Sequence, residues 1–225
     1  MYIYGVHPVS ELLDIAPGQI TTLYAASLDD SRLAELVERA RTEGISCERV
    51  DSGYLDQLCH GGNHQGVALQ TRPFRYTELD TIIDATAQKS QALVLILDHV
   101  QDPGNLGAVL RSAAAFGVDG VVLPKDRACG VTATVIRRSA GLAYRVPVAM
   151  VTNLNRTLAS LADNGYWSVG CDAAGDDDLW SIDLDMKTTM VIGSEHDGIS
   201  RLVGENCDFI AKIPMAASAE SLNAA

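Results

Sequence analysis

Residues 92–125 read ALVLILDHVQDPGNLGAVLRSAAAFGVDGVVLPK: a short apolar run, a segment of small residues at helical spacing, and a second apolar run. The same alternation continues along the chain through TATVIRRSAG, VPVAMV, NLNRTLASLADNG, YWSVGCDA, TTMVIGS, SRLVGENC and FIAKIP. Short, continuously apolar strands separated by helices are typical of a parallel sheet that is covered on both faces. We therefore predict an α/β fold whose ligands lie beyond the carboxyl ends of its strands.

The first part of the chain predicts a smaller α/β unit of its own. A helix with apolar positions at helical spacing ends at Gly44, between the strand-like runs ITTLYAAS and ISCERV. DSGYLDQLC predicts a further helix opened by an Asp or Ser cap, and a glycine-rich turn and the strand VALQTR follow it. After Pro73 the pattern weakens to one helix and a polar connector. We predict an N-terminal domain, a linker and a C-terminal domain at residues 1–72, 73–91 and 92–225.

Composition is that of a globular protein. Of the 225 residues, 47% are hydrophobic, which is enough for a substantial core. No apolar run approaches the roughly 20 residues of a membrane helix, and MYIYGVHPVSELL has no basic leader followed by an apolar stretch. The 5 cysteines are widely spread and include no CxxC pair, which argues against a disulfide framework and a zinc site. We expect a cytoplasmic protein with no membrane span and no metal site.

The charges are distributed unevenly. A formal net charge of −12 argues against a nucleic-acid partner, because phosphates are bound by Lys and Arg. Between residues 111 and 156, however, the only acids are Asp119 and Asp126. The basic residues of this segment are Arg111, Lys125, Arg127, Arg137, Arg138, Arg145 and Arg156. The segment forms either one basic face on an acidic body or an ordinary solvated surface.

The turn that opens the helix within residues 92–125 is not a dinucleotide-binding loop, since Gly104 and Gly107 do not make a GxGxxG pattern. Asn105 is placed to cap a helix that starts at Leu106, its side chain accepting a backbone N–H of the first turn. Arg111 projects from another face of this helix than the apolar one, among small neighbours. A planar, permanently charged guanidinium in that setting suits phosphate or carboxylate binding, and a plain surface arginine is the alternative.

Two later segments carry polar residues just after an apolar strand. MVIGSEHDGI, residues 190–199, ends its strand at Gly193, where a ligand can approach the backbone closely, and continues with Ser194 and Glu195. The alternative is that Ser194 and Glu195 cap the next helix. AKIPMAASAESLNAA, residues 211–225, passes from a strand through a proline turn to Ser221 and Asn223, and it is uninformative by itself.

Together and in this order, DPGNLGAVLRSAAAFGVDGVVL, VIGSEHDGI and IPMAASAESLN resemble the three motifs of the SpoU-type (TrmH-like) 2′-O-ribose RNA methyltransferases, which belong to the trefoil-knotted SPOUT class. The resemblance runs from about Leu93 to the end of the sequence. GVHPVSELL and HQGVALQ are similar to this family's small RNA-binding domain of the ribosomal-protein L30e type. Within the family, the two domains together most resemble the bacterial enzymes that methylate a guanosine ribose of 23S rRNA.

The resemblance implies S-adenosylmethionine as cofactor, held largely by backbone groups in a knotted cleft, in a protein that forms a homodimer. By position, the residues lining the cofactor would be Gly193, Ile213 and Leu222. The residues that the family gathers near the methyl group would be Arg111, Asn105, Glu195, Ser221 and Asn223. To RNA binding we assign His64 and Gln65 of a loop, and Arg137 and Arg138 of the basic segment.

A ribose 2′-OH is a poor nucleophile at neutral pH, so an acceptor must take its proton as the oxygen attacks the sulfonium methyl in line. Family mechanisms give this step to the first-motif arginine, here Arg111, helped by the substrate phosphate. A guanidinium is a weak base because its pKa lies above about 12, so phosphate anchoring is the better supported role of Arg111. A hydrolytic triad of His99, Asp98 and Ser112 would need a geometry that the sequence does not signal.

Two alternatives to a 23S rRNA methyltransferase remain open from the sequence. The same catalytic motifs serve tRNA ribose methyltransferases, and only the N-terminal domain favours rRNA. A non-catalytic RNA-binding relative is the second alternative: the family continues past SLN into a helix that completes the knot and adds to the dimer interface, whereas this sequence ends at Ala225. We therefore expect the C-terminal domain to lack that final helix, which leaves cofactor affinity and dimer stability open.

Overall fold

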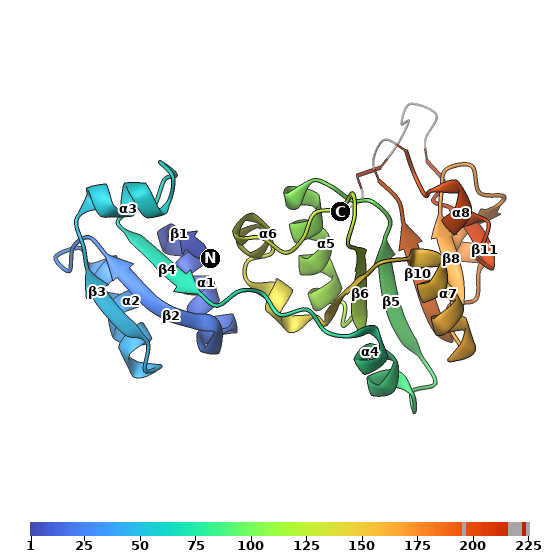
Figure 1. Ribbon diagram of the computed structural model, residues 1–225, viewed down its shortest axis with the longest axis horizontal. Helices are drawn as coiled ribbons and strands as arrows, with labels where there is room; N and C mark the ends of the chain where they lie inside the picture. Colours follow the sequence, from blue (N-terminus) through green and yellow to red (C-terminus); the bar gives the residue numbers. More distant parts are fainter. Residues whose placement is uncertain (195–196, 216–221, 224–225) are drawn as a thin grey trace. The chain divides into compact units, whose positions relative to one another are not determined.

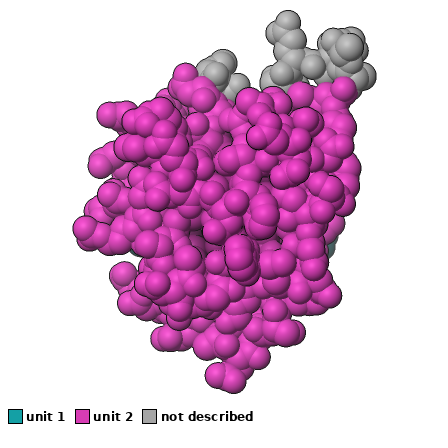
Figure 2. Space-filling view, turned by 90° about the vertical axis from the view of Figure 1, so that its right-hand side faces the viewer, with its two compact units in different colours: residues 1–75, 131–145 teal, residues 76–130, 146–225 magenta. Residues whose placement is uncertain are grey.

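The computed structural model describes residues 1–194, 197–215 and 222–223, and the chain folds into two compact units. Unit 1 consists of residues 1–75 and 131–145, and unit 2 consists of residues 76–130 and 146–225. Figure 2 shows one face of unit 2. Both units combine helices with a β-sheet, which confirms the predicted α/β class (Figure 1). No helix within the described ranges is long and apolar enough to cross a membrane.

Unit 1 is organised around a sheet whose described strands follow the order β1-β4-β2-β3. The β2–β3 pair is parallel, and β4 pairs antiparallel with both β1 and β2. The elements of unit 1 are β1 (Tyr2–Tyr4), α1 (Val6–Ile15), β2 (Ile20–Ala25), α2 (Ser31–Thr42), β3 (Ser46–Arg49), α3 (Ser52–Leu58), β4 (Val67–Thr71) and α6 (Ala133–Arg138), with 3₁₀ turns at Pro17–Gln19 and Leu142–Arg145.

The helices α2 and α3 of unit 1 form where the sequence predicts them. α2 begins after Asp30, whose side chain accepts a hydrogen bond from the backbone N–H of Arg32, and Gly44 follows its end with a φ of 72°. α3 is opened by the predicted aspartate cap, since Asp51 accepts from the N–H of Tyr54 at 2.8 Å. The sequence does not predict the strand Tyr2–Tyr4, because three residues are too few for a periodic signal.

Unit 2 is organised around a sheet whose described strands follow the order β7-β6-β5-β10-β8-β11-β9, and all neighbouring strands in it are parallel. This confirms the predicted parallel sheet. The elements of unit 2 are α4 (Leu79–Thr86), β5 (Ala92–Leu97), α5 (Pro103–Ala115), β6 (Gly120–Pro124), β7 (Val148–Val151), α7 (Leu154–Asp163), β8 (Trp167–Cys171), β9 (Asp177–Asp178), β10 (Lys187–Ile192), α8 (Arg201–Gly204) and β11 (Phe209–Lys212), with a 3₁₀ turn at Leu179–Ser181.

One face of the unit 2 sheet is covered by α4, α7 and α8, which share a buried cluster with the strands. Its buried members are Ile82, Ile83, Ala92, Val94, Ile96, Val122, Ala149, Leu154, Leu158, Leu161, Tyr166, Val191 and Val203. Because side chains alternate along a strand, Leu95 and Leu97 face the other side of the sheet, and they too are buried. Burial on both faces explains why the strands read as continuous apolar runs.

The segment 73–91, predicted as a linker, contains α4, and the Ile82 and Ile83 side chains of α4 belong to the unit 2 core. Residues 131–145, which the prediction places in the C-terminal domain, group with unit 1. These assignments depend on packing between residues far apart in sequence, and local periodicity carries no information about such packing.

Candidate functional site

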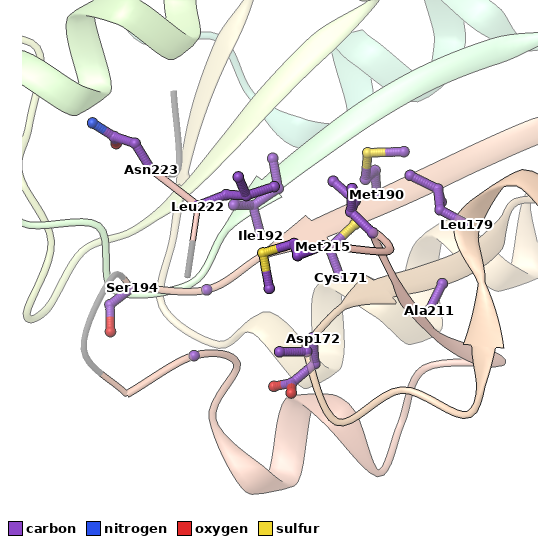
Figure 3. Close-up of a pocket in the computed structure, with 14 residues that line it drawn as sticks. Cys171, Asp172, Leu179, Met190, Ile192, Ser194, Ala211, Met215, Leu222 and Asn223 are labelled. Carbon is purple, nitrogen blue, oxygen red and sulfur yellow. The ribbon is translucent and has the colours of Figure 1, made fainter. Parts of the chain in front are cut away.

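A cavity of about 360 Å³ opens at the carboxyl ends of β8, β10 and β11 (Figure 3). The strand register explains its position: Ile192 of β10 lies beside Leu97 of β5 on one side and Cys171 of β8 on the other. The chain therefore leaves three adjacent strands at the same level. The lining residues are Cys171, Asp172, Ala173, Leu179, Met190, Ile192, Gly193, Ser194, Gly198, Ala211, Ile213, Met215, Leu222 and Asn223.

The wall of the cavity is largely apolar. In Figure 3 the side chains of Cys171, Met190, Met215 and Leu222 lie around the same space. Burial raises the pKa of the Cys171 thiol to about 11, so this group is neutral at physiological pH. An apolar wall with a few polar groups at its rim is typical of small-molecule and cofactor sites.

The rim of the cavity at Gly193 is made by a tight turn. A Cβ atom on Gly193 would lie 2.0 Å from the carbonyl carbon of Gly198, so the two backbones pass in direct contact. Ser194 and Gly198 exchange backbone hydrogen bonds of 3.1 and 3.0 Å, and the Ser194 hydroxyl accepts from the N–H of Asp197. The predicted alternative in which Ser194 caps the next helix is wrong, because α8 starts at Arg201 and Ser200 precedes it.

Asp172 brings a carboxylate to the rim, and sequence reasoning missed it. Its Oδ1 accepts a hydrogen bond from the N–H of Ala174 at 2.9 Å, and its Oδ2 would lie 3.1 Å from a Cβ built on Gly198. The available signal is its place near the carboxyl end of the predicted strand YWSVGCDA, but the acids that follow at Asp176, Asp177 and Asp178 disguise it as part of an acidic loop.

The structure brings four of the predicted site residues to this one cavity, namely Gly193, Ile213, Leu222 and Asn223. They come from two segments that are twenty or more residues apart in sequence, the second and third motifs. Cofactor binding by these residues stays a prediction. Glu195 and Ser221, the other predicted members of these motifs, lie outside the described residues.

The two first-motif residues lie on α5. Arg111 is exposed and makes no hydrogen bond or ion pair with the rest of the described chain. The prediction that Asn105 caps this helix is wrong. The cap is Asp102, whose Oδ1 accepts from the N–H of Asn105 at 2.8 Å, and Asn105 is the third helical residue, after Pro103. Proline is favoured at the first helical position because its missing N–H is not needed there. Pro103 therefore starts the helix, and the residue before it, Asp102, is the cap.

The predicted RNA-binding residues of unit 1 have partners within that unit. His64 is 9% exposed. Its Nδ1 accepts from the N–H of Gly66 at 3.0 Å, and its Nε2 lies 3.2 Å from Asp56 Oδ1. Gln65 Oε1 accepts from the N–H of Val6 at 2.9 Å, which satisfies a free donor at the start of α1. Both side chains hold the loop before β4 in shape, and RNA contact by them stays a prediction.

Arg137 and Arg138 lie at the end of α6. The guanidinium of Arg137 stacks over the ring of Tyr4 at 4.7 Å from its centroid, a cation–π contact that orders the side chain. Arg138 is exposed.

All five cysteines are free thiols, and no cluster of three or more potential metal ligands occurs within the described ranges.

Comparison with known proteins matches the two ends of the chain to two family models. Residues 92–225 match the model of the SpoU rRNA Methylase family, and residues 2–77 match the RNA 2'-O ribose methyltransferase substrate binding model. An "Uncharacterized tRNA/rRNA methyltransferase" of Mycolicibacterium gilvum is 49% identical over 99% of this chain and 71% of its own length. A protein of Mycobacterium avium with the same description is 47% identical over 99% of this chain and 72% of its own length.

Solved structures extend the comparison. The SpoU methyltransferase AviRb from Streptomyces viridochromogenes is 27% identical, with a TM-score of 0.79 over 100% of this chain and 83% of its own. Its complex with the cofactor AdoMet gives 25% identity and a TM-score of 0.80 over 100% of this chain and 84% of its own. From the two matching families, the relatives and these structures, we conclude that the chain belongs to the SpoU family of RNA methyltransferases and uses S-adenosylmethionine.

Proposed function

We propose that this enzyme transfers the methyl group of S-adenosylmethionine to the ribose 2′-OH of a guanosine in 23S rRNA, and that it does so in the cytoplasm as a homodimer. In this proposal unit 2 is a trefoil-knotted SPOUT domain and unit 1 is an L30e-like domain that binds the RNA. The observation that carries it is the cavity at the carboxyl ends of β8, β10 and β11, where residues of the second and third motifs meet.

The residues present fit the cofactor. The apolar wall that includes Met190, Ile192 and Leu222 suits a purine ring, and the cavity volume falls in the range of small-molecule sites. The close backbone approach between Gly193 and Gly198 requires a residue without a Cβ at this point of the rim. When bound, S-adenosylmethionine supplies an electrophilic methyl group on a sulfonium.

We propose that Arg111 binds the RNA substrate. Its exposed guanidinium has no partner in the described chain, so it is available to a phosphate of the RNA. Held next to the reacting ribose, it would orient the 2′-OH and, with that phosphate, take part in removing its proton. We propose that Asn105, Glu195, Ser221 and Asn223 complete the surroundings of the methyl group.

On the RNA side, we propose that His64, Gln65, Arg137 and Arg138 of unit 1 contact the substrate. Arg138 is the most available of them, because it is exposed and Arg137 is already stacked on Tyr4. The chain carries few basic residues for an RNA-binding protein, with 17 Lys and Arg against 29 Asp and Glu. Specific contacts must therefore supply more of the affinity than general attraction to phosphate.

The test is transfer of a labelled methyl group from S-adenosylmethionine to total RNA that lacks modification, followed by mapping of the label. We expect label on a ribose of 23S rRNA, and we expect Arg111→Ala to lower the rate by about 100-fold or more. Arg156→Ala is the matched control, because Arg156 is another exposed arginine on a unit 2 helix, and it should transfer at the wild-type rate.

Each other outcome changes a stated part of the proposal. Label in tRNA would keep the ribose chemistry and replace the substrate. An unchanged rate for Arg111→Ala would remove Arg111 from the reaction. Binding of RNA without binding of the cofactor would indicate a non-catalytic RNA-binding relative.

A further inference from the structure

Asp98 lies between the cavity, formed by the second and third motifs, and the first-motif helix α5. It is the first residue after β5, its side chain is 0% exposed, and its backbone N–H donates to the carbonyl of Ile192 at 2.8 Å. Since Gly193 comes directly after Ile192, Asp98 stands beside the start of the turn that forms the rim of the cavity. In the other direction the chain runs from Asp98 into α5, which carries Arg111.

The Asp98 side chain also reaches the far end of this turn. Its Oδ2 accepts a hydrogen bond from the backbone N–H of Ser200 at 2.7 Å. Ile192 and Ser200, which lie on either side of the rim residues Gly193, Ser194 and Gly198, are thus both attached to Asp98, Ile192 through a backbone bond and Ser200 through this carboxylate. The second attachment joins residues 102 positions apart in sequence.

The buried carboxyl group of Asp98 has few hydrogen-bond donors around it. Its Oδ1 is buried and makes no hydrogen bond, and the Nδ1 of His99 lies against it. His99 has a φ of 61°, in the left-handed region that is strained for a residue with a Cβ. A buried carboxylate with one backbone donor, next to a strained histidine, is costly for stability. Backbone strain of this kind concentrates at functional positions.

We propose that Asp98 is a positioning residue for cofactor binding: by holding the Ser200 end of the turn, it keeps Gly193, Ser194 and Gly198 at the wall of the cavity. The inference rests on the proposed cofactor site in that cavity. Asp98 does not touch the cofactor and acts through the backbone of the turn. His99 supports it by placing a ring nitrogen against the carboxylate oxygen that lacks a hydrogen bond.

The experiment measures the affinity of the whole chain for S-adenosylhomocysteine by calorimetry, with amide exchange of Ser200 as a second readout. Asp98→Ala removes the acceptor, so we expect affinity to fall by about tenfold or more and the Ser200 amide to exchange faster. Asp98→Asn keeps a carbonyl oxygen that can accept from Ser200, so it should restore affinity to within about threefold of wild type.

Asp208→Ala is the matched control. Asp208 Oδ2 accepts from the backbone N–H of Ser168 at 2.8 Å and from the Ser168 hydroxyl at 2.7 Å, but Ser168 is near the amino end of β8, away from the cavity. This variant should melt at a lower temperature yet bind S-adenosylhomocysteine within about twofold of wild type.

The outcomes separate the inference from the proposed function. If the wild-type chain does not bind S-adenosylhomocysteine, the proposed cofactor site is wrong. If the wild type binds and folded Asp98→Ala binds equally well, the positioning role is wrong. If Asp98→Ala does not fold, Asp98→Asn decides. Weak binding with a protected Ser200 amide, or near-normal binding with a rapidly exchanging one, would overturn the inference, and near-normal binding with a protected amide would support it.

Discussion

Gly193→Ala is the sharpest test of the turn at the rim of the cavity. Gly193 does not have a positive φ, so the substitution adds no backbone strain of its own. The new Cβ would lie 2.0 Å from the Gly198 carbonyl carbon, 2.2 Å from its oxygen and 2.3 Å from the nitrogen of Ile199. Ordinary contacts begin at 3.4 Å, so the two backbones must separate by roughly 1.4 Å.

A separation of that size breaks the paired backbone hydrogen bonds between Ser194 and Gly198. At about 0.5–1.5 kcal/mol each, their loss costs about 1–3 kcal/mol locally. Because Gly193, Ser194 and Gly198 all line the cavity, the same displacement changes the shape of the proposed binding site. We expect affinity for S-adenosylhomocysteine to fall by at least about tenfold, and methyl transfer to fall with it.

The assay is calorimetric titration with S-adenosylhomocysteine, run beside a thermal melt. Gly117→Ala is the control: Gly117 has a φ of 69°, and a Cβ added there would meet no atom within 4 Å, so alanine costs only backbone strain at the end of α5. It should lower the melting temperature and leave the affinity unchanged. Wild-type affinity in a folded Gly193→Ala protein would refute the argument that this backbone contact shapes the cofactor site.

Two further predictions concern α5 and the cavity wall. Asp102→Ala removes the cap that accepts from the Asn105 N–H, so denaturant titration should show a loss of about 1 kcal/mol in unit 2, and an unchanged midpoint would contradict this assignment of the cap. With its pKa raised to about 11, Cys171 should be alkylated at pH 8 roughly 100-fold more slowly than an exposed thiol, and about tenfold faster for each pH unit up to that pKa. Mass spectrometry of the labelled peptide measures this rate, and rapid labelling at pH 8 would show that the thiol is not buried.

The sequence is most informative where a property is local. The strands of unit 2 are continuous apolar runs because both faces of the sheet are covered, and this pattern is visible without a structure. The cap of α5 is also visible: Pro103 at the first helical position indicates Asp102 as the cap, and Asn105 competes for that position only because its amide can play the same role.

Other features depend on partners that the sequence does not name. Nothing in residues 92–97 indicates that their neighbour is the strand at residues 187–192. His64 has the sequence context of an exposed loop residue, yet one hydrogen bond from the N–H of Gly66 and a contact with Asp56 hold it in a buried position. Asp172 is hidden for the same reason, since its significance comes from Gly198 across the cavity rim.

The place of β10 in its sheet has a consequence for biosynthesis. β10 lies between β5 and β8, so until residues 187–192 have been made, the strands β5, β6 and β7 have no link to β8. A nascent chain emerging from the ribosome can complete unit 1 once residue 145 is available, but it cannot join the two parts of the unit 2 sheet. The pairing of β10 with β5 joins residues about 95 positions apart, and forming contacts between residues so far apart in sequence is slow. The cavity at the ends of β8, β10 and β11 can therefore form only after residues 187–212 have been made.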